Sequence, residues 1–394
     1  MISVEEAKKL VIENSPVFGG EKIAVSEAIG RVISQNILAP ISLPSFRQSA
    51  MDGYCIIKSD FENGIKEFHM AGEIPAGSKQ KIALKKEECY RIFTGAPVPD
   101  NATAVIMQEN VLAQESKIII RQEGIKEQEN IRQIGEDISE GEIAVEQYHI
   151  VNPATVGFLN SLGIIEVEVY KKPKIAIVVT GNELIEPGKE LPFGGVYESN
   201  GQMLKAALSQ LNIKAEVFKL KDDYKSTIEL ISHLTNQYEL ILFSGGISVG
   251  DYDFVGKALN ELNSTTIFYK VNQKPGKPLY FGKLEGSFVF GLPGNPSSSL
   301  VCFYEYVLPW INNSQKKCPS FLLQKNLSLT HDFTVKPGRA QFLKARVFEN
   351  KVTILEGQNS FMLKSFTQAN ALVYLDGEKV SFKSSDNVEV HILP

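Results

Sequence analysis

Three glycine-bearing turns each follow an apolar, strand-like run, and together they are suited to hold an anion. They are Thr180-Gly181-Asn182-Glu183, Ser244-Gly245-Gly246-Ile247-Ser248-Val249-Gly250-Asp251 and Gly291-Leu292-Pro293-Gly294-Asn295-Pro296. Glycine lets backbone N–H groups approach an anion closely, and a helix that begins after the turn adds a favourable dipole. One such turn is common in α/β proteins, but three on one rim favour an anion or nucleotide site. None of the three is a Walker A or dinucleotide-binding fingerprint.

Two lysines flank a Pro-Gly turn in the segment Lys274-Pro275-Gly276-Lys277-Pro278, which follows another predicted strand. The prolines fix the backbone, so both ammonium groups can point into the same space and are preorganised for an oxyanion. Taken alone, the same five residues also fit a basic surface turn.

Three more loops, all in the first part of the chain, combine polar side chains with glycine or proline. They are Ser49-Ala50-Met51-Asp52-Gly53-Tyr54, Thr94-Gly95-Ala96-Pro97-Val98-Pro99 and Arg132-Gln133-Ile134-Gly135-Glu136-Asp137. By themselves they fit an ordinary turn, a rigid loop and a solvated charge cluster, because Asp beside Gly is typical of turns.

The spacing of the cysteines and histidines argues against a zinc or redox centre. The four cysteines are Cys55, Cys89, Cys302 and Cys318, and the five histidines are His69, His149, His233, His331 and His391. No two cysteines form a C-x-x-C pair, and the histidines lie far apart in the sequence. A metal site in this chain should therefore use oxygen ligands, which favours Mg²⁺.

A sheet is needed to bring the three glycine turns together, and the sequence between residues 173 and 316 predicts one. Apolar runs at 174–179, 215–220, 239–243, 266–271 and 288–290 alternate with helical patterns near 200–211, 224–236, 254–262 and 297–311. This alternation predicts a doubly wound parallel sheet covered by helices on both faces, which is a three-layer α/β domain. Ligands bind beyond the carboxyl ends of the strands in such sheets.

The rest of the chain predicts three further parts. Residues 41–140 alternate short strands with Gly and Pro turns and form a β-rich domain. It is inserted into a small mixed α/β domain made of residues 1–40 and 141–172, in which Ser3 caps a first helix and Pro153 opens another. Residues 317–394 have short alternating strands and little helix, which predicts a β-barrel or sandwich.

Length and composition restrict the class of protein. The 394 residues are 43% hydrophobic and 22% charged, which is typical of a globular chain. The formal net charge of −5 argues against a dedicated nucleic-acid binder. No apolar run reaches the length of about 18 residues that a membrane span needs, and no signal peptide is evident. The sequence therefore predicts a cytoplasmic protein without a membrane or nucleic-acid partner.

Seven of these segments, in this order, resemble the molybdopterin molybdenumtransferase family of the MoeA type, which includes the E domain of gephyrin. The motifs are Ser-Ala-Met-Asp-Gly-Tyr (49–54), Thr-Gly-Ala-Pro-Val-Pro (94–99), Arg-x-x-Gly-Glu-Asp (132–137), Thr-Gly-x-Glu-Leu (180–184), Gly-Gly-Ile-Ser-Val-Gly-Asp-Tyr-Asp (245–253), Lys-Pro-Gly-Lys-Pro (274–278) and Leu-Pro-Gly-Asn-Pro (292–296). Each motif alone is weak, but seven in order are specific, and they span essentially the whole chain.

The resemblance implies an enzyme that takes adenylylated molybdopterin and molybdate and, with Mg²⁺, releases AMP and leaves molybdenum on the dithiolene. It implies that the α/β domain is of the molybdopterin-binding type and that the mixed domain serves as linker and dimerisation domain. The expected homodimer places the active cleft between the α/β domain of one subunit and the β-rich domain of the other. Molybdopterin adenylyltransferase and downstream cofactor-handling proteins are further expected partners. The choice between molybdate and tungstate, and the molybdoenzymes served, stay open.

The resemblance also implies the site residues. The expected catalytic residues are Asp52, Thr94, Asp137, Glu183, Asp251, Lys274 and Lys277, with Glu183 and Asp251 as Mg²⁺ ligands. The expected substrate-binding residues are Arg132, Gly181, Ser244, Gly245, Gly246, Ser248, Gly250, Pro293, Gly294 and Asn295. The set is coherent, because cleaving a phosphoanhydride needs charge neutralisation and positioning more than covalent catalysis.

Two positions depart from the family pattern. Asn182 stands where the family usually has Asp, which removes one negative charge but keeps Glu183. The serine- and glycine-rich loop expected in the C-terminal domain differs at 358–365, which argues against a C-terminal contribution to the site and leaves Ser365 as a candidate there.

Two alternative functions share part of this sequence pattern. Molybdopterin adenylyltransferases and competence-damage-inducible proteins share the α/β domain and its glycine turns, but lack the motifs at 49–53 and 274–278. Fold analogy alone does not fix function. The other alternative, a scaffold without activity, would not need the carboxylates and lysines retained here.

Overall fold

The computed structural model describes residues 1–220, 223–246 and 254–394, which form two compact units. Unit 1 comprises Met1–Glu21 and Tyr170–Pro394, and unit 2 comprises Lys22–Val169. Three expected site residues, Ser248, Gly250 and Asp251, lie outside the described residues.

Unit 1 is built on a six-stranded sheet with the strand order β16-β13-β17-β21-β20-β18. The strands are β13 (Ile175–Thr180), β16 (Ala215–Leu220), β17 (Leu240–Ser244), β18 (Thr265–Tyr269), β20 (Tyr280–Leu284) and β21 (Ser287–Leu292). The first four in spatial order are parallel, which confirms the predicted doubly wound core. The sequence analysis missed β20, which pairs antiparallel with both β21 and β18. The two-residue connection between β20 and β21 is a hairpin, and a hairpin joins only antiparallel strands.

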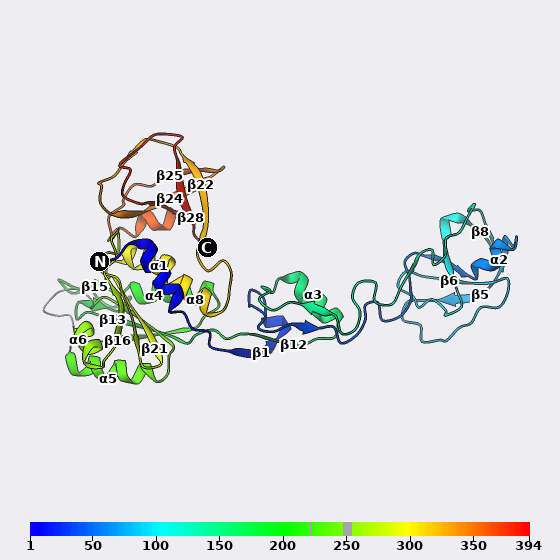
Figure 1. The fold of residues 1–394 in the computed structure, drawn as a ribbon, viewed down its shortest axis with the longest axis horizontal. Helices are drawn as coiled ribbons and strands as arrows, with labels where there is room; N and C mark the ends of the chain where they lie inside the picture. The colour runs from blue at the N-terminus through cyan, green and yellow to red at the C-terminus, as the bar shows by residue number, and fades with distance from the viewer. Residues whose placement is uncertain (221–222, 247–253) are drawn as a thin grey trace. The chain divides into compact units, whose positions relative to one another are not determined.

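Helices cover both faces of this sheet (Figure 1). One face carries α1 (Val4–Glu13), α4 (Asn200–Gln210), α7 (Pro296–Cys302), the π-helical turn η3 (Phe303–Val307) and α8 (Leu308–Ser314), and the other carries α5 (Tyr224–Thr235) and α6 (Phe254–Glu261). The side chains of β13 pack alternately against the helices on the two faces of the sheet. Ile175, Ile177 and Val179 pack toward the first group of helices, and Ala176 and Val178 pack toward the second. Successive strand side chains point to opposite faces, so a continuous apolar run fits a buried strand.

The first helix of the chain packs in the unit 1 core. Ser3 caps α1 by accepting a hydrogen bond from the Glu6 N–H at 3.1 Å, as predicted. Val11 is fully buried in the same core as Trp310, whose Nε1 donates to the Asn14 carbonyl at 2.8 Å. A short apolar stripe fits any complementary surface, so the sequence could not identify which one it covers.

The C-terminal part of unit 1 is a β-barrel. Its strands are β22 (Leu323–Leu329), β24 (Ala340–Phe348), β25 (Lys351–Ile354), β26 (Ala371–Leu375) and β28 (Asn387–Ile392). They close on themselves because β24 pairs with both β25 and β26. The short strand β19 (Gln273–Lys274) adds to β24 in parallel. Smaller elements of unit 1 are β14 (Leu184–Ile185), β15 (Val196–Tyr197), β23 (Phe333–Thr334), η4 (Lys364–Gln368) and β27 (Ser381–Phe382).

Unit 2 contains a six-stranded sheet with the order β7-β4-β6-β5-β9-β8. Its strands are β4 (Gly53–Ile56), β5 (Glu67–Ile74), β6 (Glu88–Ile92), β7 (Ala104–Met107), β8 (Val111–Gln114) and β9 (Lys117–Ile120). The other elements are β1 (Gly20–Ala24), η1 (Val25–Glu27), β2 (Ile37–Leu38), β3 (Gln48–Ser49), α2 (Lys58–Glu62), η2 (Gln108–Asn110), β10 (Ile131–Arg132), β11 (Ile143–Val145), α3 (Pro153–Ser161) and β12 (Glu166–Tyr170). A separate core of unit 2 is formed by the segments that precede and follow this sheet in the sequence. Val25 and Ile33 belong to the preceding segment, and Val145 and Leu159 belong to the following one. This arrangement agrees with a β-rich insertion, and the finer division into four domains stays a prediction.

No helix in the described parts of either unit is long and apolar enough to cross a membrane.

Candidate active site

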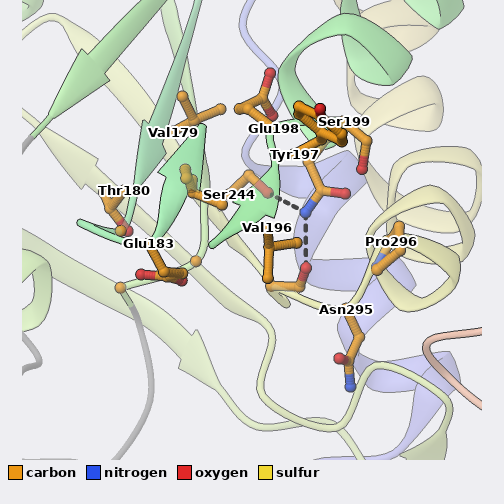
Figure 2. A pocket seen from close by; sticks show the side chains of 16 residues that line it. Val179, Thr180, Glu183, Val196, Tyr197, Glu198, Ser199, Ser244, Asn295 and Pro296 are labelled. Carbon is orange, nitrogen blue, oxygen red and sulfur yellow. Dashed lines mark hydrogen bonds between the residues drawn. The ribbon is translucent and has the colours of Figure 1, made fainter. Parts of the chain in front are cut away.

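The three glycine turns of unit 1 come together around one cavity of about 620 Å³ (Figure 2). The expected site residues that line it are Gly181, Glu183, Ser244, Gly245, Gly246, Gly294 and Asn295. The cavity lies beyond the carboxyl ends of β13, β17 and β21. After β13, the next strand of the sheet, β16, pairs on one side of β13, and the following strand, β17, pairs on the other side. This edge of the sheet is therefore a topological switch point. Pro293 is buried and does not line the cavity.

Two carboxylates line this cavity, and they differ in their freedom. Glu198 is buried, and its Oε1 accepts a hydrogen bond from the Gly201 N–H at 2.7 Å, which fixes it at the start of α4. Glu183 is exposed and folds back over Gly181, where φ is +138° and an added Cβ would lie 2.7 Å from Glu183 Oε1. Glycine at 181 is therefore required for the position of this carboxylate. The described residues contain no group of three or more His, Cys, Asp or Glu side chains that could hold a metal ion.

Asn200 joins two of the strand ends. Its Nδ2 donates to Ser244 Oγ at 2.8 Å and to the Gly294 carbonyl at 2.7 Å, and its Oδ1 is buried without a partner in the described residues. The sequence analysis missed Asn200, together with Tyr197 and Glu198 beside it. The available signal was its position at the first residue of a predicted helix on the same sheet edge.

Lys274 lines a second cavity of unit 1, of about 550 Å³, which also includes Lys336 and Arg339. β19 pairs with β24, with Lys274 opposite Gln341, and Gln341 Nε2 donates to the Lys336 carbonyl at 3.0 Å. Lys277 is half-buried in the same loop and does not line this cavity. Lys274, Lys336 and Arg339 are exposed and form no ion pair within the described ranges. Such uncompensated positive charge is typical of an anion site.

The C-terminal barrel contributes a loop that contacts the first cavity through a serine not named from the sequence. The buried Lys344 donates from Nζ to the carbonyls of Gly357 at 2.7 Å and Met362 at 2.9 Å, and burial lowers the pKa of this ammonium group. In the loop held this way, Ser360 Oγ accepts a hydrogen bond from Asn295 Nδ2 at 2.9 Å. Ser365, the candidate from the sequence, donates instead to the Gly357 carbonyl at 2.8 Å, within its own loop. The barrel therefore reaches the rim of the first cavity through Ser360.

In unit 2, two of the expected residues lie in contact. Asp52 Oδ1 accepts hydrogen bonds from the Thr94 N–H and from the Thr94 hydroxyl, both at 2.8 Å. These two bonds lower the pKa of Asp52, the N–H bond most strongly. Arg132 lies opposite Gln48 in the pairing of β10 with β3. Arg132 and Asp137 are both exposed.

Family models match almost the whole chain. The model of the MoeA N-terminal region (domain I and II) matches residues 2–163, that of a probable molybdopterin binding domain matches 176–313, and that of the MoeA C-terminal region (domain IV) matches 326–393. The match thus extends beyond the α/β domain that the alternative enzymes share.

Full-length relatives agree with these matches. A molybdopterin molybdenumtransferase of Haemophilus influenzae is 34% identical over 99% of this chain and 98% of its own length, and one of Staphylococcus epidermidis is 31% identical over 99% and 95%. A solved structure of a molybdopterin biosynthesis MoeA protein from Pyrococcus superimposes with a TM-score of 0.86 at 29% identity, covering 100% of this chain and 99% of that one. The chain therefore belongs to the molybdopterin molybdenumtransferase family of the MoeA type.

Proposed function

We propose that this enzyme inserts molybdate into adenylylated molybdopterin and releases AMP in a Mg²⁺-dependent reaction. The observation that carries the proposal is the pair of cavities in unit 1. One combines glycine turns with an exposed carboxylate, and the other gathers lysine and arginine side chains. A substrate with a pyrophosphate and a second substrate that is an oxyanion need these two environments.

The first cavity suits the nucleotide and its pyrophosphate. Glycine turns at strand ends expose backbone N–H groups to phosphate oxygens, and Asn200 holds two of the turns in register. Mg²⁺ is commonly held by one or two carboxylates together with substrate phosphates, and Glu183 fits that pattern. Asp251 stays a sequence prediction for a second carboxylate. Bound Mg²⁺ would neutralise the charge that develops on the leaving phosphate oxygens.

The second cavity suits the oxyanion. Lys274, Lys336 and Arg339 supply positive charge there without a carboxylate partner in the described residues. Guanidinium and ammonium groups form charge-assisted hydrogen bonds to oxyanions. Molybdate and tungstate have nearly the same size and charge, so this cavity is expected to accept both.

The two cavities divide the work of the reaction. Water cleaves the phosphoanhydride, so AMP leaves and the pterin keeps its own phosphate. The two dithiolene thiols bond to molybdenum, and the oxide that they displace leaves as water with their two protons. The protein contributes by holding both substrates in place and by neutralising their charge. An enzyme that adenylylates molybdopterin must supply the substrate. We also propose that the protein is cytoplasmic.

We further propose a homodimer in which Asp52 of the partner subunit and Thr94 of the partner subunit complete each site. Support comes from the family resemblance and from the placement of Asp52 in a compact unit separate from the one that contains both cavities. Mixing Asp52→Ala with Glu183→Ala protomers should restore activity, because some heterodimers then contain one intact site. Confirmed subunit exchange without recovered activity would contradict the shared site.

The function is tested by measuring AMP release from adenylylated molybdopterin with molybdate or tungstate, with and without Mg²⁺. The proposal expects release that needs both an oxyanion and Mg²⁺. Release without either, or no turnover by the folded protein, would contradict it, and the second result would favour the scaffold alternative.

A further inference from the structure

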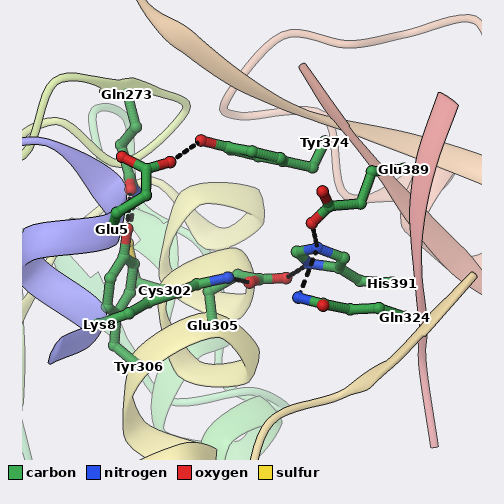
Figure 3. Close-up of polar contacts among 10 residues, drawn as sticks. All are labelled: Glu5, Lys8, Gln273, Cys302, Glu305, Tyr306, Gln324, Tyr374, Glu389 and His391. Atoms are coloured by element: carbon green, nitrogen blue, oxygen red, sulfur yellow. Dashed lines mark hydrogen bonds and ion pairs between the residues drawn. The ribbon is translucent and has the colours of Figure 1, made fainter. Parts of the chain in front are cut away.

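A buried glutamine lies directly before the first lysine of the Lys274–Lys277 loop. Gln273 has no exposed surface, and its Nε2 donates to the carbonyls of Pro275 at 3.0 Å and Gly276 at 3.3 Å. Its Oε1 accepts a hydrogen bond from the Tyr306 hydroxyl (Figure 3). The amide nitrogen of Gln273 is therefore bonded to the loop, and the amide oxygen is bonded to Tyr306.

The packing around Gly276 leaves this loop little room to move. Gly276 has a φ of +88°, and an added Cβ would lie 2.5 Å from Cys302 Sγ and 2.9 Å from Gln273 Nε2. Cys302 is itself fully buried, and its thiol lies 3.8 Å from the Gly276 carbonyl. The turn between the two lysines thus packs against Cys302 of α7, and Gln273 links it to Tyr306 of η3.

The helical turn that carries Tyr306 is also fixed. The neighbouring Glu305 is buried and forms an ion pair with Lys8 of α1 and a hydrogen bond with His391 of β28, both at 2.7 Å (Figure 3). Burial opposes the ionisation of Glu305, but these two partners lower its pKa overall. The contacts of Glu305 with α1 and β28 therefore fix the helical turn from which Tyr306 bonds Gln273.

The strand geometry links this anchor to the second cavity. Successive side chains of a strand point to opposite faces, so when Gln273 of β19 points inward, Lys274 points outward. Gln273 pairs with Ala340 and Lys274 pairs with Gln341. Gln273 is buried and Lys274 lines the cavity, as this alternation requires.

We propose that Gln273, anchored by Tyr306, is a positioning residue that holds the Lys274–Lys277 loop in the conformation that binds the oxyanion. The inference rests on the proposed function. An apolar side chain of equal volume would fill the same space, but it would remove the amide donor of the Pro275 carbonyl and leave the Gly276 carbonyl with the Cys302 thiol alone. Lys274 would then sample several orientations, and a preorganised site would be lost.

The primary test is Gln273→Met in the full-length protein, which keeps the volume and removes both donors. We expect the KM for molybdate to rise by roughly three- to tenfold for each hydrogen bond lost, with little change in kcat at saturating molybdate. A merely structural role would reduce the amount of folded enzyme, and hence kcat, and leave KM unchanged. Tyr306→Phe, which leaves both amide donors in place, should raise KM in the same direction but less.

Two variants serve as matched controls. Gln315→Met removes another buried glutamine, whose Nε2 donates to the Ile311 carbonyl at 3.1 Å in α8. Tyr374→Phe removes a tyrosine hydroxyl that donates to Glu5. Both are expected to leave the KM for molybdate unchanged, and a rise equal to that of Gln273→Met would contradict the proposal.

A second readout does not depend on activity. The N–H groups of Val271 and Leu279 donate to the Lys277 carbonyl at 3.0 and 2.9 Å, so their hydrogen exchange reports on the loop. Both should exchange faster in Gln273→Met than in the wild type, and unchanged exchange would count against the proposal.

The double variant Gln273→Met with Lys274→Met separates this inference from the proposed function. Its KM should equal that of Lys274→Met alone, because Gln273 acts through the lysine, and additive rises would contradict the inference. If Lys274→Met raises KM but Gln273→Met does not, the inference fails and the oxyanion assignment stands. If Lys274→Met leaves KM unchanged, the oxyanion assignment fails and the inference fails with it.

Discussion

The two cavities of unit 1 differ in the charge they present and in how they are built. The first is formed by the ends of three parallel strands and contains the exposed Glu183. The second lies where β19 joins the barrel strand β24, and contains Lys274, Lys336 and Arg339. A carboxylate attracts Mg²⁺ and repels molybdate, whereas a lysine does the reverse. In the function proposed above, separate cavities would let one protein bind both ions without one site weakening the other.

The cavities also differ in what holds them. Backbone geometry at the strand ends shapes the first, with Asn200 as a single side-chain bridge. Buried polar side chains shape the second, because Gln273 holds the lysine loop and Lys344 holds the loop that carries Gln358. The second cavity should accordingly be the more sensitive to substitutions that do not touch the substrate.

The largest effect is expected from Lys274→Met, which keeps the length of the stem and removes the charge. The molybdate concentration needed for AMP release should rise roughly ten- to a hundredfold, since a charge-assisted contact contributes about 1.5–3 kcal/mol. The Mg²⁺ requirement should change little. Lys325→Met, at an exposed lysine of β22 outside both cavities, is the control. Equal shifts in the two variants would remove Lys274 from the oxyanion site.

Glu183→Gln is expected to have the opposite selectivity. The Mg²⁺ concentration needed should rise about tenfold, since one charged ligand of the cation is lost, while the molybdate requirement stays close to that of the wild type. Glu186→Gln is the matched control, because Glu186 is exposed, pairs with Lys189 at 2.7 Å and does not line the cavity. An unchanged Mg²⁺ response in Glu183→Gln would mean that the metal is held elsewhere.

Ser360→Ala tests the contact between the barrel loop and the first cavity. It removes the acceptor of the Asn295 hydrogen bond in an exposed position, so the KM for adenylylated molybdopterin should rise by only about threefold. Ser365→Ala is the comparison variant, because its hydroxyl bonds within the loop. A larger change in the KM of Ser365→Ala than of Ser360→Ala would favour Ser365, the sequence candidate, as the residue that acts on the first cavity.

The smallest effect concerns Asp52 in unit 2. Thr94→Val removes the hydroxyl donor but keeps the N–H donor, so the pKa of Asp52 should rise only part of the way toward its ordinary value of 3.8. A depressed pKa in the folded state stabilises the protein above the ordinary value, and this contribution is lost as pH falls through the lowered pKa. The two proteins should thus differ in unfolding free energy near neutral pH and converge in strong acid. NMR titration of the Asp52 carboxyl checks the shift, and identical curves would contradict this cause.

The first cavity could be predicted from the sequence because its residues follow a rule of chain direction. Carboxyl ends of parallel strands meet at one edge, so the sequence alone predicts that Gly181, Gly245 and Gly294 lie together. The second cavity depends on the register between β19 and β24, which joins segments of about 65 residues' separation, and no local pattern encodes that pairing. Gln273 and Lys344 were missed for the same reason, since a buried polar side chain is recognisable only from its partners.

The position of α1 and the hairpin of β20 and β21 show two other kinds of miss. The apolar stripe of α1 was recognised, but the surface that it covers depends on the tertiary fold. The hairpin turn Glu285-Gly286 was a local signal that the analysis overlooked.

The central claim, that cation and oxyanion bind in separate cavities, is tested most directly by a crossed titration of AMP release. Mg²⁺ and molybdate are varied independently for the wild type, Glu183→Gln and Lys274→Met. The account predicts that Glu183→Gln shifts only the Mg²⁺ axis and that Lys274→Met shifts only the molybdate axis. If both variants shift the same axis, or if Lys274→Met changes the Mg²⁺ requirement alone, the two ions do not occupy the cavities assigned to them.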